Sequence, residues 1–396
     1  MSQTFSSYLW PALAWLSIFA PYVAAEQLVV RSDFPGGSGI ATIDQQQRTI
    51  RLTPSVHRDR GWACWWYVKV DGLDIGETIV LDVGDAPWAT PDRAAVSVDN
   101  KTWAHTQPGK RQGNRITYKH RATSDVSWFA WGPPFLLGDA DRLVRDAAAR
   151  CEHARAFELC RTRGGNRVPA LMVGDESKAK AGIWIQARQH AWETGSSWVC
   201  RGLTEWATSD DPRAKSLRSK ACLTIVPVMD VDNVMRGAGG KDQRPQDHNR
   251  DWSSEPHWHS VRAATSLIAA LNARGRFDLF VDLHNPGAGS RRPFFYVPPR
   301  DMLSERGREN LDLFLSLVQL EMTGPLPFQG ETQVSGPNYD KNWQKISKNW
   351  VAENTAEHVV AVTLETAWNT PHSTASGYET VGRELGQAIE RYLRTR

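Results

Sequence analysis

Short runs of hydrophobic and β-branched residues, separated by polar turns, fill the first third of the chain from about residue 27 to residue 131. Gly, Pro and Asp interrupt these runs at the spacing expected of strands and tight turns. The pattern predicts an antiparallel β-sandwich over residues 26–135. The clearest runs are Thr49–Leu52, Trp65–Val70, Thr78–Val83 and Ala94–Val98.

The pattern changes at Gly132-Pro133-Pro134, where the strand-like spacing ends. Apolar residues on one face of Asp139–Arg155 predict a helix, and we expect a helical linker over residues 136–167. From residue 168 onward, continuous apolar runs alternate with amphipathic stretches of helix length, as in a mixed sheet covered by helices on both faces. The predicted fold class is therefore α/β, with the β-sandwich followed by a mixed-sheet α/β domain over residues 168–396. The predicted strands are Ala170–Val173, Ile183–Ala187, Leu223–Met229, Phe277–Leu283, Phe294–Val297 and Val359–Leu364, and the predicted helices include His257–Asn272, Glu305–Met322 and Gly377–Arg396.

The N-terminal segment from Met1 to Ala25 carries no charged side chain and is almost wholly apolar or small after Leu9. Val23-Ala24-Ala25 offers the small residues found at signal-peptidase sites, so we expect a signal peptide over residues 1–25 and an exported, periplasmic or secreted protein. An uncleaved N-terminal anchor is the alternative. Pro11 and Pro21 argue against a stable spanning helix, which needs about 20 apolar residues. We therefore expect no stable membrane span after cleavage.

The composition of the chain narrows the choice of partners and compartment. A net charge of +3 over 396 residues is too small for an electrostatic nucleic-acid surface, so we expect no nucleic-acid partner. The 18 tryptophans are unusual, and indole rings serve both in cores and in surfaces that grip peptides or sugars. The five cysteines include no CxxC pair, which argues against a cysteine-ligated zinc site. In an oxidising compartment we expect disulfides Cys151–Cys160 and Cys200–Cys222, with Cys64 left over.

Polar residues follow the apolar strands of the predicted α/β domain, at the edge where ligands collect in such folds. His190 and Glu193 have i, i+3 spacing, which lets one helical turn or tight loop aim both side chains at a single point. His284 directly follows the run Phe277–Leu283 and could supply a third ligand. Two histidines and a glutamate form a catalytic zinc set that leaves one position for water. A histidine at a strand end is more often a satisfied structural residue, but the shared edge favours the metal.

Two further segments carry charged residues that the packing of the predicted fold does not explain. Glu365 ends the apolar run Val359–Leu364, an unfavourable place for an unpaired carboxylate. Arg250 offers a planar fork of donors that meets a carboxylate with two hydrogen bonds, and Asn249 adds a third donor. The alternatives are a carboxylate with a structural partner at Glu365 and a solvated polar loop at Asn249-Arg250.

Taken together, these segments resemble the zinc metallocarboxypeptidases of the carboxypeptidase A type. The details are most similar to the cytosolic carboxypeptidase subfamily and its bacterial relatives. Aromatic segments of the predicted β-sandwich also resemble the domain that precedes the catalytic domain in that subfamily, so the resemblance covers nearly the whole mature chain. The segments that carry it are His190-x-x-Glu193, Asn249-Arg250, Asp282-Leu283-His284, Leu364-Glu365-Thr366, Trp65-Trp66-Tyr67, and residues 97–103 and 128–135.

The resemblance implies that residues 168–396 form a zinc carboxypeptidase catalytic domain that binds one Zn²⁺ per chain. It implies a peptide substrate with a free C-terminal carboxylate, from which the last residue is released. The metal ligands would be His190, Glu193 and His284, and the carboxylate would be held by Asn249 and Arg250.

The resemblance also assigns roles in the reaction itself. Glu365 would serve as the general base and then as the general acid, and Tyr339 would cap the substrate. The family uses a cationic residue ahead of the Asn-Arg pair to polarise the scissile carbonyl. Spacing leaves three candidates for this cation, and we favour the last of Arg236, Lys241 and Arg244.

Two functions of other classes stay open. The same zinc scaffold could hydrolyse a non-peptide amide as a deacylase, or a catalytically silent exported protein could grip a peptide or glycan with its tryptophans. The joint presence of the zinc set and Glu365 favours the enzyme, with the β domain as a structural brace. Arg291 and Arg292 could face the pocket and favour an acidic C-terminal residue, or could belong to a solvated basic loop.

Overall fold

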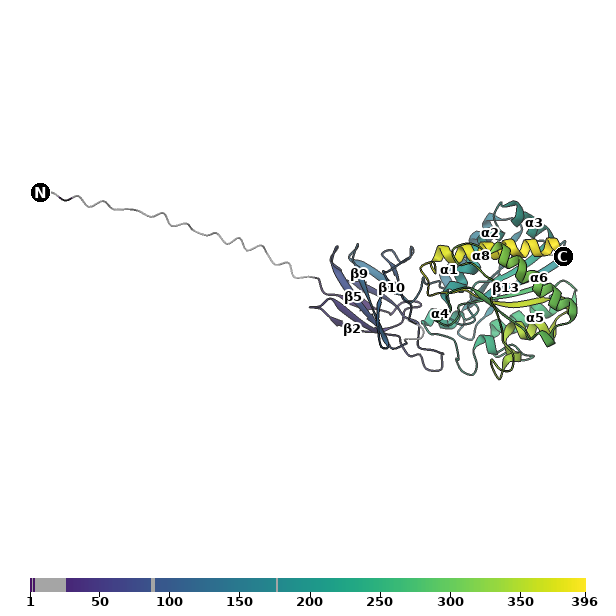
Figure 1. Ribbon diagram of the computed structural model, residues 1–396, viewed down its shortest axis with the longest axis horizontal. Helices are drawn as coiled ribbons and strands as arrows, with labels where there is room; N and C mark the ends of the chain where they lie inside the picture. The colour runs from purple at the N-terminus through teal and green to yellow at the C-terminus, as the bar shows by residue number, and fades with distance from the viewer. Residues whose placement is uncertain (2, 4–25, 87–89, 176) are drawn as a thin grey trace.

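The computed structural model describes residues 1, 3, 26–86, 90–175 and 177–396, which form a β domain and an α/β domain (Figure 1). Apart from Met1 and Gln3, the predicted signal peptide lies outside the described residues, so export stays a prediction. Within the described ranges, no helix has both the length and the apolar character needed to cross a bilayer.

Two five-stranded sheets form the β domain, as the short alternating runs predict. Neighbouring strands are antiparallel in both sheets, except that β3 and β5 pair in parallel. Every second residue of β5 is buried, so the alternation of side chains along the strand fills the core of the domain. The first sheet has the order β1 (Val29–Arg31), β4 (Tyr67–Asp71), β10 (Val126–Ala130), β6 (Ala95–Ser97), β7 (Ala104–His105); the second has the order β2 (Ile40–Asp44), β3 (Thr49–Thr53), β5 (Thr78–Val83), β9 (Arg115–Arg121), β8 (Lys110–Gln112).

An eight-stranded mixed sheet forms the centre of the α/β domain. Its four central strands, β14, β13, β15 and β18, are mutually parallel, and nearly all of their residues are buried. Burial on both faces explains why these strands read as continuous apolar runs and not as alternating ones. The sheet order is β11 (Ala154–Arg161), β12 (Arg167–Val173), β14 (Ala221–Val226), β13 (Ala181–Ala187), β15 (Leu279–His284), β18 (Val360–Glu365), β16 (Phe294–Val297), β17 (Thr332–Val334).

Helices cover both faces of this sheet. Helix α2 packs along α8 over one face, and α5 lies on the opposite face (Figure 1). Several helices begin at a residue whose side chain accepts a backbone N–H, such as Asp211 before α3 and Ser304 before α6, and each such cap is worth about 1 kcal/mol. The helices are α1 (Leu137–Arg150), α2 (Thr194–Ala207), α3 (Pro212–Lys220), α4 (Val231–Arg236), α5 (His259–Ala273), α6 (Glu305–Glu321), α7 (Ser347–Asn354) and α8 (Ala375–Thr395), with 3₁₀ turns at His248–Arg250, Arg300–Met302 and Trp343–Lys345.

The segment predicted as a helical linker, residues 136–167, belongs to the α/β domain. It contains α1 and the strand β11, which pairs antiparallel with β12 at the edge of the eight-stranded sheet. Sequence periodicity missed β11 because an edge strand is only partly covered, and charged residues such as Arg155 and Glu158 interrupt its apolar positions.

Tryptophans join the two domains. Trp131, at the end of the β domain, lies 5.0 Å from Trp192 and 4.6 Å from Trp368 between ring centroids. Trp192 lies between the predicted ligands His190 and Glu193, and Trp368 follows Glu365 by three residues. Part of the unusual tryptophan content therefore fixes the β domain against the segments that carry the candidate site.

The predicted disulfides do not form. Cys151, Cys160 and Cys200 are free thiols, which rules out both Cys151–Cys160 and Cys200–Cys222. Cys151 precedes β11 and Cys160 lies near its far end, and six strand residues extend about 20 Å. That separation exceeds the Cα distance of about 4.4–6.8 Å that a disulfide spans.

Candidate active site

Three parallel strand ends bring the candidate residues together. Strands β13, β15 and β18 are hydrogen-bonded neighbours, so their C-terminal ends share one edge of the sheet. His284 is the last residue of β15 and lies opposite Glu365, the last residue of β18. His190 follows the end of β13 at Ala187 by three residues. The edge predicted from the apolar runs is the place where these side chains meet.

A tight turn after β13 aims His190 and Glu193 at one point. Arg188 adopts φ +63, in the left-handed region, and redirects the chain as it leaves the strand. Its buried guanidinium donates to the carbonyl oxygen of Ala191 at 2.6 and 2.8 Å and to that of Phe135 at 3.1 Å. Sequence reasoning missed this role of Arg188, because the residue type does not reveal that the side chain is buried.

His190, Glu193 and His284 form a buried cluster that fits a metal ion. The two carboxylate oxygens of Glu193 lie 2.7 Å from Nδ1 of His190 and 2.7 Å from Nδ1 of His284. One ligand atom from each residue lies within 4.8 Å of the other two. This spacing suits zinc bonds of about 2.0–2.2 Å, and two histidines with one carboxylate are the protein ligands of many catalytic zinc sites.

A buried aspartate contacts the other nitrogen of each histidine. Nε2 of His190 lies 3.4 Å from Asp247, and Nε2 of His284 lies 3.0 Å from Asp282. A carboxylate at Nε2 fixes the proton there and leaves Nδ1 as the metal-binding atom. Burial alone would raise the pKa of Asp247, but the neighbouring His190 and Lys241 hold that pKa well below its usual range. We did not predict Asp247; its only signal is its place two residues ahead of the Asn-Arg pair.

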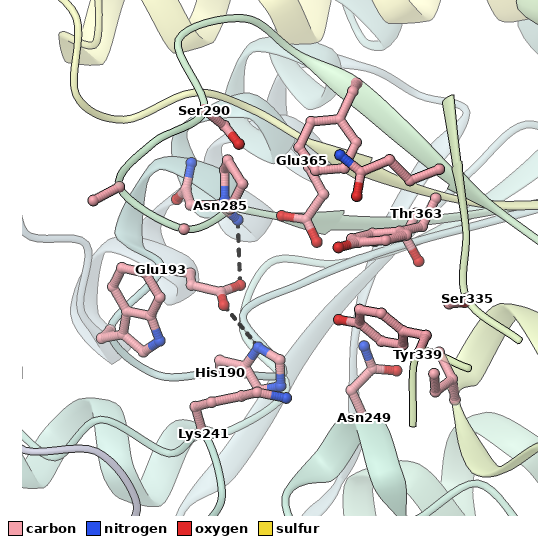
Figure 2. A pocket seen from close by; sticks show the side chains of 18 of the residues that line it. His190, Glu193, Lys241, Asn249, Asn285, Ser290, Ser335, Tyr339, Thr363 and Glu365 are labelled. Carbon is pink, nitrogen blue, oxygen red and sulfur yellow. Dashed lines mark hydrogen bonds and ion pairs between the residues drawn. The ribbon is translucent and has the colours of Figure 1, made fainter. Parts of the chain in front are cut away.

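Glu365 lies beside this cluster, and its carboxylate lines a cavity that His190 and Glu193 also line (Figure 2). Its Oε2 is buried and is one of the few such atoms, within the described residues, that lack a hydrogen-bond partner. Burial raises the pKa of Glu365 to about 7. A carboxyl group with a pKa near neutrality can both accept and return a proton near neutral pH.

The predicted carboxylate-binding residues line the same cavity, which has a volume of about 540 Å³ (Figure 2). Asn249 is held by Ser347, whose backbone N–H donates to its Oδ1 at 3.0 Å. Arg250 donates from Nε to Asp340 at 2.7 Å, and its guanidinium lies 5.8 Å from the ring centroid of Tyr339. Tyr339 is about half exposed at the rim of the cavity, as a side chain that covers a substrate would be. Asp340, which orients Arg250, was not predicted.

Of the three candidate cations Arg236, Lys241 and Arg244, only Lys241 lines this cavity. The Arg244 side chain is 83% exposed and lies 3.6 Å from Asp59, outside the cavity. Lys241 lines the cavity, and its ammonium lies 3.5 Å from Asp247. Our prediction of Arg244 was therefore wrong. The candidate cations share one loop, and the turn at Gly239-Gly240 directs Lys241, but not Arg244, toward the cavity.

The far end of the cavity is polar. Lys348 is fully buried there, and its ammonium donates to Ser335 and, at 2.7 Å, to Asn349. Thr363 lines the same region with a buried hydroxyl that has no hydrogen-bond partner within the described residues. Burial, and then the nearby Arg250, lower the pKa of Lys348 well below its usual range. Sequence reasoning missed Lys348, which lies in a segment without a recognisable motif.

Arg291 and Arg292 do not line this cavity. Arg291 lies 3.2 Å from Asp92 of the β domain, and Arg292 lies 3.6 Å from Glu331. Both side chains are more than half exposed. The solvated basic loop is the reading that the structure supports.

Comparison with known proteins gives two family matches that together cover most of the chain. The zinc carboxypeptidase family matches residues 141–367, and the cytosolic carboxypeptidase N-terminal domain matches residues 30–131. Cytosolic carboxypeptidase 1 of Danio rerio is 32% identical over 187 residues, which are 43% of this chain and 16% of that protein. An uncharacterised protein of Zymomonas mobilis is 28% identical over 268 residues, which are 66% of this chain and 68% of that protein. The chain thus spans about a sixth of the length of the cytosolic carboxypeptidase that it matches.

Solved structures share the whole architecture. A metallo-carboxypeptidase from Burkholderia cenocepacia has a TM-score of 0.79 at 21% identity, covering 93% of this chain and 100% of that one. A metallo-carboxypeptidase from Pseudomonas aeruginosa, in complex with (2-guanidinoethylmercapto)succinic acid, has a TM-score of 0.76 at 20% identity, covering 92% of this chain and 100% of that one. At these identities the likeness establishes the fold of both domains.

Proposed function

The chain belongs to the zinc carboxypeptidase family, and from this membership we propose that it is a zinc-dependent exopeptidase that hydrolyses the C-terminal peptide bond of peptides. One observation carries the proposal. A single cavity is lined by His190 and Glu193, which cluster with His284, and by the buried Glu365 and the guanidinium of Arg250. Peptide hydrolysis at a chain end needs all three: a metal site, a proton acceptor and a site for the terminal carboxylate.

Glu365 has the position and the pKa of the proton-transfer group. Zinc, when bound, supplies a Lewis acid that polarises the peptide carbonyl and lowers the pKa of water toward about 7. The carboxylate of Glu365, which lines the cavity, would accept the proton of the attacking water and pass it to the leaving amine. Burial raises the pKa of Glu365 to about 7, so this carboxylate is a stronger base than an exposed glutamate.

Lys241 is the residue that we propose for the developing negative charge on the carbonyl oxygen. Its ammonium lies in the cavity on the His190 side and is held 3.5 Å from Asp247. A donor that is fixed before the reaction stabilises charge that appears only in the transition state, and loss of one such donor costs about 10²–10³-fold in kcat. One carboxylate oxygen of Asp247 contacts His190 and the other contacts Lys241, so both side chains would lie beside the scissile peptide bond of a bound substrate.

Arg250 and Asn249 form the proposed site for the terminal carboxylate. Asp340 binds Nε of Arg250 and so sets the plane of the guanidinium. Guanidinium groups bind carboxylates through paired hydrogen bonds, and the side chain is only 10% exposed, which strengthens such a pair. Tyr339 stands over Arg250 at the rim and would cover the bound chain end.

This carboxylate site predicts a strong preference for free chain ends over amidated ones. A desolvated charge pair is worth about 2–5 kcal/mol when one partner is removed, so amidation should lower kcat/KM by about 30-fold to 4,000-fold. In Arg250→Met the free acid should lose a similar factor, and its advantage over the amide should shrink toward one. The measurement is a rate comparison of one peptide in both forms with both proteins. A preference that survives unchanged in Arg250→Met would contradict the assignment, and Arg306→Met, at an exposed position of α6, serves as the control.

The polar end of the cavity points to an acidic side chain at the C-terminal position of the substrate. The ammonium of Lys348 is bound by a hydroxyl and an amide, and within the described residues it makes no hydrogen bond or ion pair with a carboxylate. The unpartnered hydroxyl of Thr363 adds a second donor in the same region. A substrate carboxylate would give the ammonium a counter-charge and the Thr363 hydroxyl an acceptor, whereas an apolar side chain would supply neither.

We accordingly expect peptides that end in Glu to be cleaved about 10–100-fold faster, in kcat/KM, than the same peptides ending in Gln. Lys348→Met keeps the length of the side chain and should remove most of that preference. Rates with the two peptides, measured on wild type, Lys348→Met and the exposed neighbour Lys345→Met, check this result. The pocket assignment is wrong if Lys348→Met keeps the preference of the wild type.

A further inference from the structure

One loop of the β domain contacts the candidate active site of the α/β domain. Residues 59–62, here called the β-domain loop, lie directly against residues 239–244, here called the lysine loop. Three backbone hydrogen bonds join them: Trp62 N–H to the Lys241 carbonyl at 2.9 Å, Gly240 N–H to the Arg60 carbonyl at 2.9 Å, and Arg244 N–H to the Asp59 carbonyl at 3.0 Å. The residue at the centre of this pairing is Lys241, the proposed donor to the carbonyl oxygen.

The contact between the two loops leaves no room for a side chain on either of two glycines. A Cβ on Gly61 would lie 2.2 Å from the carbonyl oxygen of Lys241, and a Cβ on Gly239 would lie 2.1 Å from the carbonyl oxygen of Trp62. Gly61 also adopts φ +84 and Gly240 φ +79, which glycine reaches without strain. This contact is between backbone atoms, which cannot move aside by a rotamer change. It therefore fixes the position of the lysine loop more tightly than side-chain packing would.

Trp62 extends the contact to the cavity itself. Its indole N–H donates to Asp242 at 2.8 Å, next to Lys241 in the sequence, and its ring lines the cavity beside Trp192 at 6.5 Å between centroids. From the other side, the carboxylate of Asp247 binds the Asp242 N–H at 3.2 Å and the Lys241 ammonium at 3.5 Å. Lys241 is therefore fixed at its backbone by the β domain and at its ammonium by the α/β domain.

We propose that the β-domain loop is a positioning element for Lys241, so that the β domain is a working part of the catalytic site and not only a brace. The inference rests on the proposed role of Lys241 in the reaction. A shift of the lysine loop by about 1 Å would misplace the ammonium relative to the carbonyl oxygen, and misplacements of that size can cost about 10²-fold in rate. The lysine loop also contacts the turn that carries two of the proposed zinc ligands, since the Gly239 carbonyl accepts the Trp192 N–H at 3.1 Å, so zinc content is measured in every variant.

Two substitutions test the contact from its two sides. Gly61→Ala, from the β domain, and Gly239→Ala, from the α/β domain, should each lower kcat about 10–100-fold, with KM changed less than about 3-fold and zinc content unchanged. Gly76→Ala is the matched control, because Gly76 also lies in the β domain at φ +92 but has only the far end of Arg121 near its Cβ, at 3.9 Å. It carries similar backbone strain without touching the lysine loop, and its kcat should stay near that of the wild type.

The same substitutions in a Lys241→Met background separate positioning from general damage. If the glycines act through Lys241, each double variant should have the kcat of Lys241→Met alone, because the misplaced group is already absent. An equal further loss in that background, or a wild-type kcat in both single variants, would overturn the inference. A wild-type kcat for Lys241→Met itself would instead reject the proposed role of Lys241. Should Gly61→Ala fail to fold, Gly239→Ala, which adds no positive-φ strain, decides between these outcomes.

Discussion

Glu365→Gln should lower kcat by about 10³–10⁴-fold while leaving zinc content and substrate binding close to those of the wild type. Glutamine has nearly the same size and keeps an acceptor oxygen, so the substitution removes the ionisable group and little else. The metal cluster is formed by other residues, His190, Glu193 and His284, and should stay intact. Because Glu365 Oε2 has no hydrogen-bond partner to lose, the unfolding temperature should stay close to that of the wild type.

The measurement is steady-state kcat with zinc content on the same samples. Glu353→Gln, at an exposed position of α7, is the control for a general effect of removing one glutamate. Full loss of kcat with one zinc per chain supports Glu365 as the proton-transfer group. A kcat within about 10-fold of the wild type would reject that role, because general acid–base catalysis contributes at least about 10²-fold.

His284→Ala should abolish both zinc binding and hydrolysis. The substitution removes one of three protein ligands and leaves Asp282 and Glu193 buried without the imidazole between them. Removing one partner from a buried charged pair costs about 3–5 kcal/mol of stability, so the unfolding temperature should also fall. Elemental analysis, a peptide assay and a thermal unfolding curve on one preparation measure all three effects.

The control for His284→Ala is His372→Ala, which removes an exposed histidine ahead of α8. It should keep stoichiometric zinc, full activity and an unchanged unfolding temperature. A folded His284→Ala protein that still binds one zinc and cleaves peptides would show that His284 is not a ligand, and the cluster assignment would then be wrong.

The strand ends were predictable because parallel strands impose a simple rule. Each central strand is buried on both faces, so its residues are continuously apolar, and a polar residue that follows such a run marks the edge of the sheet. His284 and Glu365 fall at that point and face each other in register. The sequence therefore predicted which residues share the edge before any contact between them was known.

Residues held by loops were less predictable, since loop geometry leaves no periodic signal. Spacing left three candidate cations open and we favoured Arg244, whereas the choice depends on how a glycine turn directs the chain. Trp62 could not be assigned to the cavity at all, because it lies about 180 positions ahead of the loop it contacts and in another domain. Strand β11 was not predicted for a related reason: at the edge of the sheet its residues form a mixed polar and apolar pattern in place of an apolar run.

We propose that this chain removes C-terminal residues from peptides in a zinc-dependent reaction. The most direct measurement is mass spectrometry of a defined peptide after incubation with the zinc-loaded wild-type protein, with the protein stripped by chelator, and with the stripped protein after zinc is returned. We expect the peptide to lose its C-terminal residue with the first and third samples and to stay intact with the second. Three results would rule out a carboxypeptidase: cleavage inside the peptide, release from the N-terminus, or no cleavage by folded, zinc-loaded protein across peptides with different C-terminal residues.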